Sequence, residues 1–383
     1  MEGATLSDSP NSATRRAVLR NGLAVAGAIP VTGLSATAAP PNGKLVFTYD
    51  DGPVEDYTHT YQKAHRREGV PACSAVPSSY VGNSGNLSAD QLQNLTDEGW
   101  EIMSHSIKHR MLGHIAVTRD IAADDRRIYV EENFHGSFPD DTLDVSDGSQ
   151  STTVTVAGKG SDNRGKFIRV KSPVGQSFTA SDDVFTHYTK DIIRMALKKS
   201  KRQLESYGVS VTNIVMPYAG YGERTQKMVD EYYRAVANAE STGGGNPPIV
   251  EPSQIRLPHL SRMLFREGTA TKAEIGTFLD KIASQNGLGI LGGHSWWQER
   301  LPPSRIRMVI QMAKDRNIDI VTLRNALVDL GITTTTSRTT SATTNAQTTT
   351  NPPAMKRDRL GLGVLAALAG IGGAAALKRY GRT

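Results

Sequence analysis

Residues 44–53 read KLVFTYDDGP, an apolar run that ends in two adjacent aspartates and a Gly-Pro turn. The apolar run predicts a buried strand, and residues 57–68 after the turn have the pattern of a helix. The same β-then-α unit recurs along the chain. Further strands are expected at residues 70–76, 100–104, 211–216, 287–291 and 318–322, and further helices at residues 88–98, 191–207, 271–285 and 304–316. Repeated units of this kind predict an α/β fold with a parallel sheet, either open or closed into a barrel.

One segment interrupts this rhythm. Residues 133–187 are rich in Asp, Ser, Thr and Gly, and residues 152–156 and 166–170 alternate with period two. Such alternation predicts half-buried antiparallel strands, so we expect a small antiparallel β module inserted into the α/β body. A glycan-binding role and a role as a structural lid or spacer are both open for it, and the second is favoured because folds carry many inert insertions.

The first 38 residues have the order of an export signal. The pair Arg15-Arg16 is followed by an apolar stretch at residues 22–34 and by small residues at 36–38. This order resembles a twin-arginine signal peptide, the alternative being a basic tail before a short buried helix. We therefore expect the twin-arginine translocase to export the chain and residues 1–38 to be removed, leaving a body at residues 39–331.

The residues after the body have the composition of a tether. Residues 332–359 form a Thr-rich stalk, and residues 360–377 contain only Leu, Ile, Val, Ala and Gly. A helix of that length spans about 27 Å, close to the thickness of a bilayer core. The alternative is a Gly/Ala-rich helix packed on the body. The transmembrane interpretation predicts a cell-surface protein anchored to the cytoplasmic membrane, with the basic residues 378–383 in the cytoplasm.

The formal net charge of +6 is located at the two ends of the chain. Residues 332–383 hold seven Lys or Arg against one acid, and residues 1–38 hold three against two, which leaves the body with a net charge of −1. A body without a cationic field has no electrostatic basis for nucleic-acid binding, so that partner is excluded.

Four short segments lie at the ends of predicted strands, where parallel α/β folds place their functional groups. They are residues 48–53 (TYDDGP), 104–109 (SHSIKH), 215–221 (VMPYAGY) and 291–295 (LGGHS). In the second segment His105 and His109 lie four residues apart, so both fall on one side of a helical turn and can share a metal. The remaining histidines His59, His65 and His114 lack such a position and are interpreted as structural. The lone cysteine, Cys73, is interpreted as a buried thiol.

In this order the four segments resemble the motifs of the polysaccharide deacetylases, the NodB-homology domain of carbohydrate esterase family four. The resemblance covers about residues 44–330. It implies a distorted (β/α) barrel with one divalent metal ion, most often zinc, with cobalt, manganese or nickel as alternatives. The substrate it implies is an N-acetylated surface glycan or a related amide, from which acetate is released.

The resemblance also implies a role for residues of the first two segments. Asp51, His105 and His109 would hold the metal, and Asp50 would be the general base. An N-acetyl amide is a poor electrophile, so the metal would polarise its carbonyl and lower the pKa of a bound water, from which Asp50 would take a proton.

The other two segments carry the remaining implied roles. The backbone N–H of Tyr218, next to Pro217, would hold the oxyanion together with the metal, and His294 would protonate the leaving amine. Trp296, with Trp297 beside it, is expected either to form an apolar wall that stacks on a sugar or to pack in the core.

The sequence departs from the family pattern in two places. The third motif usually opens with an arginine that pairs with the catalytic base, and Val215 occupies that place. The fourth motif, an Asp/Arg set with a nearby Trp, has no clean counterpart, with Arg256 or Arg262 as substitutes. These departures support an alternative, a catalytically impaired deacetylase fold that serves as a glycan-binding surface protein.

Overall fold

The computed structural model describes residues 42–220, 223–239 and 259–331. The predicted signal peptide, stalk and membrane span lie outside these ranges, as does Arg256. Within the described part of the chain, no helix is both long enough and apolar enough to cross a membrane. All described residues belong to one compact unit, Met1–Thr335.

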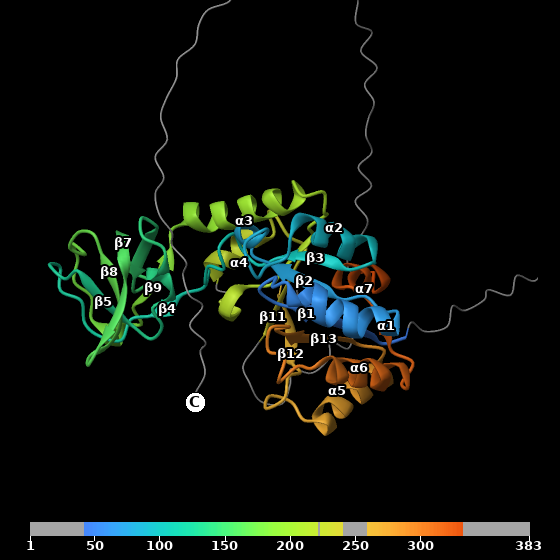
Figure 1. Ribbon diagram of the computed structural model, residues 1–383. Coiled ribbons are helices and arrows are strands. Elements are labelled where there is room, and N and C mark those ends of the chain that lie inside the picture. The colour runs from blue at the N-terminus through green and yellow to red at the C-terminus, as the bar shows by residue number, and fades with distance from the viewer. Residues whose placement is uncertain (1–41, 221–222, 240–258, 332–383) are drawn as a thin grey trace, which may run out of the picture. The chain divides into compact units, whose positions relative to one another are not determined.

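Seven parallel strands close into a barrel, which confirms the predicted (β/α) barrel (Figure 1). Around the ring the order is β1, β2, β3, β10, β11, β12 and β13, and β13 pairs again with β1. A further short strand, β14 (Asp319–Ile320), pairs with β1 from outside this ring. The barrel strands are β1 (Lys44–Tyr49), β2 (Cys73–Val76), β3 (Glu101–Ser104), β10 (Asn213–Ile214), β11 (Ala235–Ala239), β12 (His259–Leu264) and β13 (Leu288–Gly293).

Successive side chains of each strand point alternately into the barrel and out toward the helices. One buried cluster collects residues from all seven strands or their immediate ends, among them Val46, Met103 and Ile290, together with residues of α7 (Leu323–Asp329). We assign this cluster to the barrel interior. Because the backbone N–H of Leu323 donates to the Cys73 sulfur at the start of β2, α7 closes the amino-terminal end of the strands. Functional residues are therefore expected at the opposite, carboxyl-terminal end of the strands.

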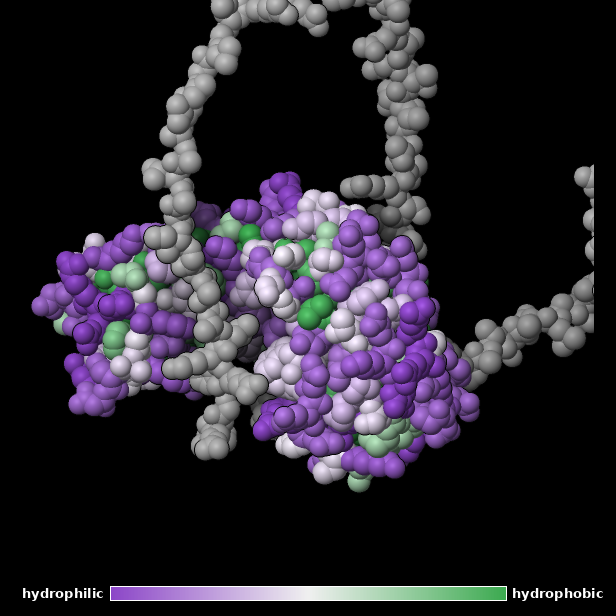
Figure 2. Space-filling model, viewed as in Figure 1, coloured by the Kyte–Doolittle hydropathy of each residue, from purple (hydrophilic) through white to green (hydrophobic). Residues whose placement is uncertain are grey.

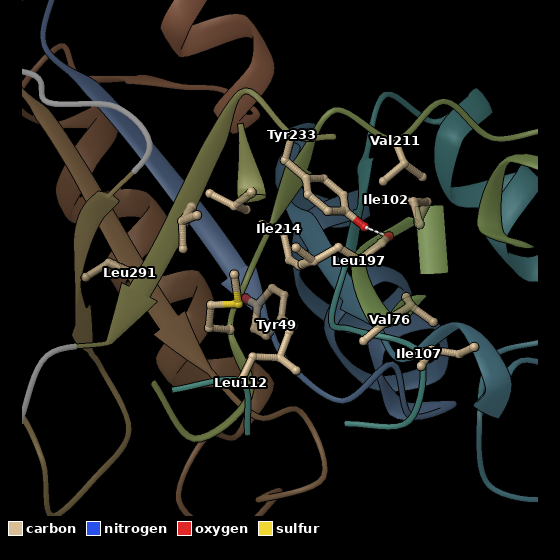
Figure 3. Packing of buried hydrophobic residues seen from close by; sticks show 14 of the residues in the cluster. Tyr49, Val76, Ile102, Ile107, Leu112, Leu197, Val211, Ile214, Tyr233 and Leu291 are labelled. Atoms are coloured by element: carbon tan, nitrogen blue, oxygen red, sulfur yellow. Dashed lines mark hydrogen bonds between the residues drawn. The ribbon is translucent and has the colours of Figure 1, made fainter. Parts of the chain in front are cut away.

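Helices cover the outside of the barrel, and their apolar faces form the larger buried cluster with the outward residues of the strands (Figure 3). In this cluster the Tyr233 hydroxyl donates to the Leu197 carbonyl at 2.8 Å. Ser88 and Thr271 begin their helices with complete capping boxes. The helices are η1 (Asp56–His65), α1 (Arg66–Glu68), α2 (Ala89–Asp97), α3 (Lys190–Glu205), α4 (Glu223–Val229), α5 (Lys272–Gln285) and α6 (Pro303–Lys314).

The predicted antiparallel module is a six-stranded sheet in the order β4, β9, β6, β7, β8 and β5. It is larger than residues 133–187, because β5 pairs with β8 and β4 pairs with β9. A short turn of helix, η3 (Phe134–Ser137), lies within it. The strands are β4 (Ile115–Ala116), β5 (Arg127–Val130), β6 (Thr142–Ser146), β7 (Ser151–Asp162), β8 (Gly165–Val170) and β9 (Phe185–Tyr188). The visible surface is mostly hydrophilic, as expected where each layer buries its apolar face (Figure 2).

Candidate metal centre and active site

Three predicted metal ligands converge at the carboxyl-terminal end of the barrel. Asp51 follows β1, and His105 and His109 follow β3. The Nε2 atom of His109 lies 3.0 Å from Asp51 Oδ1, and that of His105 lies 3.5 Å from the same oxygen. Ligand atoms of all three residues lie within 4.8 Å of one another, and no other group of three His, Cys, Asp or Glu in the described ranges meets this criterion.

The surroundings of these ligands fit a divalent ion. His105 Nδ1 donates to the carbonyl of Val215 at 2.8 Å, which fixes the tautomer and leaves Nε2 as a ligand atom. The carboxylate oxygen of Asp51 that faces both imidazoles is buried and accepts no hydrogen bond. Two imidazoles and one carboxylate around such an oxygen are a donor set that suits zinc and related ions.

The turn that carries the two histidines is not the predicted helical turn. Residues 105–109 form an irregular turn in which Ser106 (φ 60°) and His109 (φ 54°) are left-handed. Asp51, Tyr218 and Ala219 are also left-handed, so five of the nine non-glycine residues with positive φ in the described ranges belong to the site. Such conformations cost free energy and persist only where neighbouring contacts hold them.

The predicted base, Asp50, has a buried partner that the sequence did not assign to it. The Arg262 guanidinium on β12 donates from Nη1 to Asp50 Oδ1 at 2.8 Å and from Nη2 to Asp50 Oδ2 at 2.9 Å. Nη1 also donates to the Thr48 hydroxyl at 2.7 Å. Asp50 is 5% exposed and Arg262 is 2% exposed, so this bidentate pair is inside the protein. The expectation that Arg262 substitutes within the fourth motif is therefore replaced by a role beside the base.

The Arg262–Asp50 pair compensates for the arginine that the family motif has at the position of Val215. Val215 is fully buried in the interior cluster, and its carbonyl accepts the hydrogen bond from His105. The cation reaches Asp50 from β12, two strands further round the ring. Gly292 on β13 makes room for it, since a Cβ at that position would lie 3.3 Å from Arg262 Nη1.

Opposing effects set the charge of the two adjacent aspartates. Burial alone raises the pKa of Asp50, but the charge and hydrogen bonds of Arg262 outweigh it and hold that pKa below its usual value. Burial likewise raises the pKa of Asp51, and the adjacent imidazoles of His105 and His109 bring it well below the usual value. Both carboxylates are therefore ionised at neutral pH, as a base and a metal ligand require.

His294 lies on the other side of Asp51, at the end of β13. Its Nε2 atom is 3.8 Å from Asp51 Oδ2. Burial lowers the pKa of His294, although Asp50 and Asp51 counteract it. A neutral imidazole is a poor general acid, so His294 must gain a proton during turnover before it can protonate a leaving group. Its Nδ1 atom is buried and has no hydrogen-bond partner in the described part of the chain.

The residues after His294 serve two different purposes. Trp296 is 46% exposed, so it is not a core residue, and its indole N–H donates to Asp51 Oδ2 at 2.9 Å. Ser295 is buried and donates to Asp56 Oδ1 at 2.5 Å, while Ser74 donates to Asp56 Oδ2 at 2.5 Å. Burial raises the pKa of Asp56 to about 8 despite these hydroxyls. Asp56 thus fixes the segment that carries His294 and Trp296, a role that the sequence did not suggest.

The third segment places Tyr218 beside the metal ligands. Pro217 is buried and begins the single turn η5 (Pro217–Ala219) after β10. The Tyr218 ring is 52% exposed, meets the His109 ring edge-on at 4.6 Å, and stacks on Phe134 of the antiparallel module at 4.0 Å. No sequence pattern identified Phe134 as a site residue, because only the fold brings it next to Tyr218.

The residues interpreted as structural lie apart from these groups. Cys73 is a buried free thiol. His65 is buried and bonds to the Tyr49 hydroxyl at 2.8 Å, and His59 lies 3.4 Å from the carbonyl of Leu301. His114 packs against Phe185 and His187 of the module.

Residues 37–130 match the family model described as polysaccharide deacetylase. The matched segment contains the first two motifs, with Asp50, Asp51, His105 and His109. Over this segment the chain therefore resembles a polysaccharide deacetylase domain of the NodB-homology type, as the sequence predicts. No curated protein matches the chain.

The chain also has remote similarity to several solved structures. A family 4 acetyl xylan esterase from Clostridium thermocellum, in complex with a cobalt ion, is 14% identical, with 76% of this chain and 93% of that chain covered and a TM-score of 0.41. The Xyl-CE4 domain of a multidomain xylanase from the hindgut metagenome of Trinervitermes trinervoides is 13% identical, with 76% and 92% covered and a TM-score of 0.40. A CE4 family pseudoenzyme from Bacillus anthracis is 10% identical, with 76% and 66% covered and a TM-score of 0.39.

Proposed function

We propose that this protein is a metal-dependent hydrolase that removes acetyl groups from an N-acetylated surface glycan. The observation that carries the proposal is the arrangement around Asp51. His105 and His109 face one of its oxygens, and ionised Asp50 and its buried Arg262 lie beside it. The exposed rings of Tyr218 and Trp296 border the same site and suit a sugar with an apolar face.

Asp51, His105 and His109 would hold the ion. When bound, a divalent ion supplies Lewis acidity, which polarises an acetyl carbonyl and makes a water more acidic. Asp50 accepts the proton of the attacking water, and Arg262 keeps it ionised and oriented for that task. The backbone N–H of Tyr218 donates to the developing oxyanion, and His294, once protonated, passes a proton to the leaving amine.

The proposal is tested by acetate release from N-acetylglucosamine oligomers, with the full chain loaded with zinc and, in parallel, with cobalt. Acetate should form, stop after treatment with a chelator, and resume after the metal is restored. An acetylated xylan assayed beside it separates an ester substrate from an amide. A metal-loaded chain that releases acetate from neither polymer would contradict the proposal.

A catalytically impaired, glycan-binding protein is the second candidate. Among the described residues the Nδ1 atom of His294 has no hydrogen-bond partner, which favours this candidate because an acid histidine normally has a partner that orients it. The Arg262–Asp50 pair counts against it, since it removes the main departure on which that candidate rested. Tight binding of the oligomers without acetate release would favour this second function.

We also propose that the chain acts outside the cell. The order of residues 1–38 supports export by the twin-arginine translocase, and residues 360–377 support anchoring in the cytoplasmic membrane. Cell fractionation of the full chain and of a version that ends at residue 359 tests this. The full chain should sediment with membranes and the shorter one should be released outside the cell, whereas a full chain in the cytosolic fraction would contradict it.

A further inference from the structure

The segment that supplies the Tyr218 backbone N–H is held in an unfavourable conformation. Tyr218 (φ 58°) and Ala219 (φ 54°) are consecutive left-handed residues, and neither is a glycine. Consecutive left-handed residues with side chains are disfavoured because each Cβ crowds the following carbonyl. Contacts with the rest of the protein must therefore select this conformation.

Besides the edge-on contact with the His109 ring, two further contacts are available to do so. From the barrel, the Asn238 side chain on β11 donates to the carbonyl of Ala219 at 3.0 Å. From the antiparallel module, the Phe134 ring stacks on the Tyr218 ring with a centroid distance of 4.0 Å and an interplanar angle of 15°. The first contact fixes the backbone after Tyr218, and the second fixes the side chain of Tyr218 itself.

The position of Phe134 is fixed because hydrogen bonds hold both of its neighbours in the chain. Asn133 donates from its side chain to the carbonyl of Gly160 on β7 at 2.9 Å. The buried His135 ring bonds through Nδ1 to the Thr186 hydroxyl at 2.9 Å and through Nε2 to the carbonyl of Met111 at 3.1 Å. Met111 lies two residues after His109, so this histidine connects the module to the turn that carries the metal ligand.

We propose that Phe134 is a positioning residue for the proposed deacetylation. By stacking on Tyr218 it keeps that residue left-handed, and this aims the backbone N–H of Tyr218 at the place where the oxyanion forms. The inserted module is then more than a spacer, because it completes the oxyanion site of the barrel. This inference rests on the proposed function only for its kinetic consequence, since the conformation of Tyr218 can be observed independently.

The test compares Phe134→Ala with Phe134→Tyr and with Phe167→Ala as a matched control. Phe167 is a buried phenylalanine of the same module that packs on Tyr129, at a ring distance of 5.8 Å. Loss of one oxyanion donor costs about 10²–10³-fold in kcat, so partial misplacement in Phe134→Ala should lower kcat by about 10–100-fold. KM and metal affinity should change less than about twofold, because neither the ligands nor uniform substrate binding is touched. Phe134→Tyr, which restores a stacking ring, and Phe167→Ala should stay within about threefold of the native kcat.

A crystal structure of the metal-loaded Phe134→Ala chain gives a readout besides activity. Tyr218 should leave the left-handed region or become disordered, and it should stay left-handed in Phe167→Ala. A left-handed, ordered Tyr218 in Phe134→Ala would overturn the inference even if the native chain proves inactive on glycans. A raised KM with unchanged kcat would also overturn it, since the ring would then contact substrate. If Phe134→Ala does not fold, Phe134→Leu, which keeps apolar volume without an aromatic ring, replaces it in the same measurements.

Discussion

The barrel and the antiparallel module contribute to the site in different ways. Every side chain with a proposed chemical role lies on a barrel strand, as Arg262 does, or follows one, as Asp50 and His294 do. The module provides none of these, yet its Phe134 stacks on Tyr218 and its Asp141 forms a buried pair with Arg110, the residue after His109. The proposed chemistry is thus confined to the barrel, whereas the module holds barrel segments that have unfavourable backbone conformations.

Substitution of a barrel ligand should have the largest effect. His109→Ala removes one of three metal ligands, so metal affinity and acetate release should both fall by at least about 10³-fold. Calorimetric titration with zinc and an acetate assay measure the two quantities. Lys108→Ala, one residue earlier and exposed, is the matched control and should leave both unchanged. Retained activity in His109→Ala would mean that the metal is bound elsewhere. It would contradict the assignment of the chemistry to the barrel.

Removal of the cation beside the base should come next. Arg262→Met leaves Asp50 buried without its partner, so the carboxylate is disordered or protonated and kcat should fall by about 100-fold. Metal affinity should persist, because the described hydrogen bonds of Arg262 go to Thr48 and Asp50 and not to Asp51, His105 or His109. Arg262→Lys should recover only part of the loss, since an ammonium cannot form the bidentate pair. An unchanged kcat in Arg262→Met would mean that Asp50 needs no cation.

A support in the module should have a smaller effect on activity. Arg110 donates to Asp141 through Nε at 2.8 Å and through Nη2 at 3.2 Å, and both residues are buried. Asp141→Asn leaves the guanidinium without a counter-charge, so the free energy of unfolding should fall by about 3 kcal/mol. Metal affinity should fall by about tenfold, because the turn that carries His109 loses an outer support. Urea unfolding and zinc titration check this, with the exposed Asp140→Asn as control. A stability loss with full metal affinity would restrict the module to a purely structural role.

The last effect, on stability alone, is expected at Asp56, which supports the barrel site from within the barrel. Its pKa is raised to about 8 in the folded chain against about 3.9 in an unfolded one, so folding favours the protonated form. Stability from this group is complete below about pH 4 and is lost as the pH rises toward 8. Asp56→Asn cannot titrate, so its free energy of unfolding should fall less over that window than that of the native chain. Parallel slopes for the two proteins would show that Asp56 does not change its charge there.

The barrel and the convergence of Asp51, His105 and His109 were predictable because their signals are local. A short apolar run followed by polar residues predicts a strand end, and parallel strands bring such ends together whatever their distance in the chain. The pairing of Arg262 with Asp50 joins residues more than 200 positions apart and depends on the order of strands round the ring. The stack of Phe134 on Tyr218 depends in addition on how the module meets the barrel, which residue periodicity does not encode. The turn at residues 105–109 was wrongly expected to be helical, because a spacing of four also suits a turn with two left-handed residues.

The central claim is that Asp50 is a base that acts beside a metal held by Asp51, His105 and His109. The most direct test measures bound zinc and acetate release on the same preparations of the native chain and of Asp50→Asn, which has nearly the same shape. We predict one zinc per chain in both proteins and a kcat that is about 10²–10⁴-fold lower in Asp50→Asn. Equal rates of acetate release by the two zinc-loaded proteins would contradict the account.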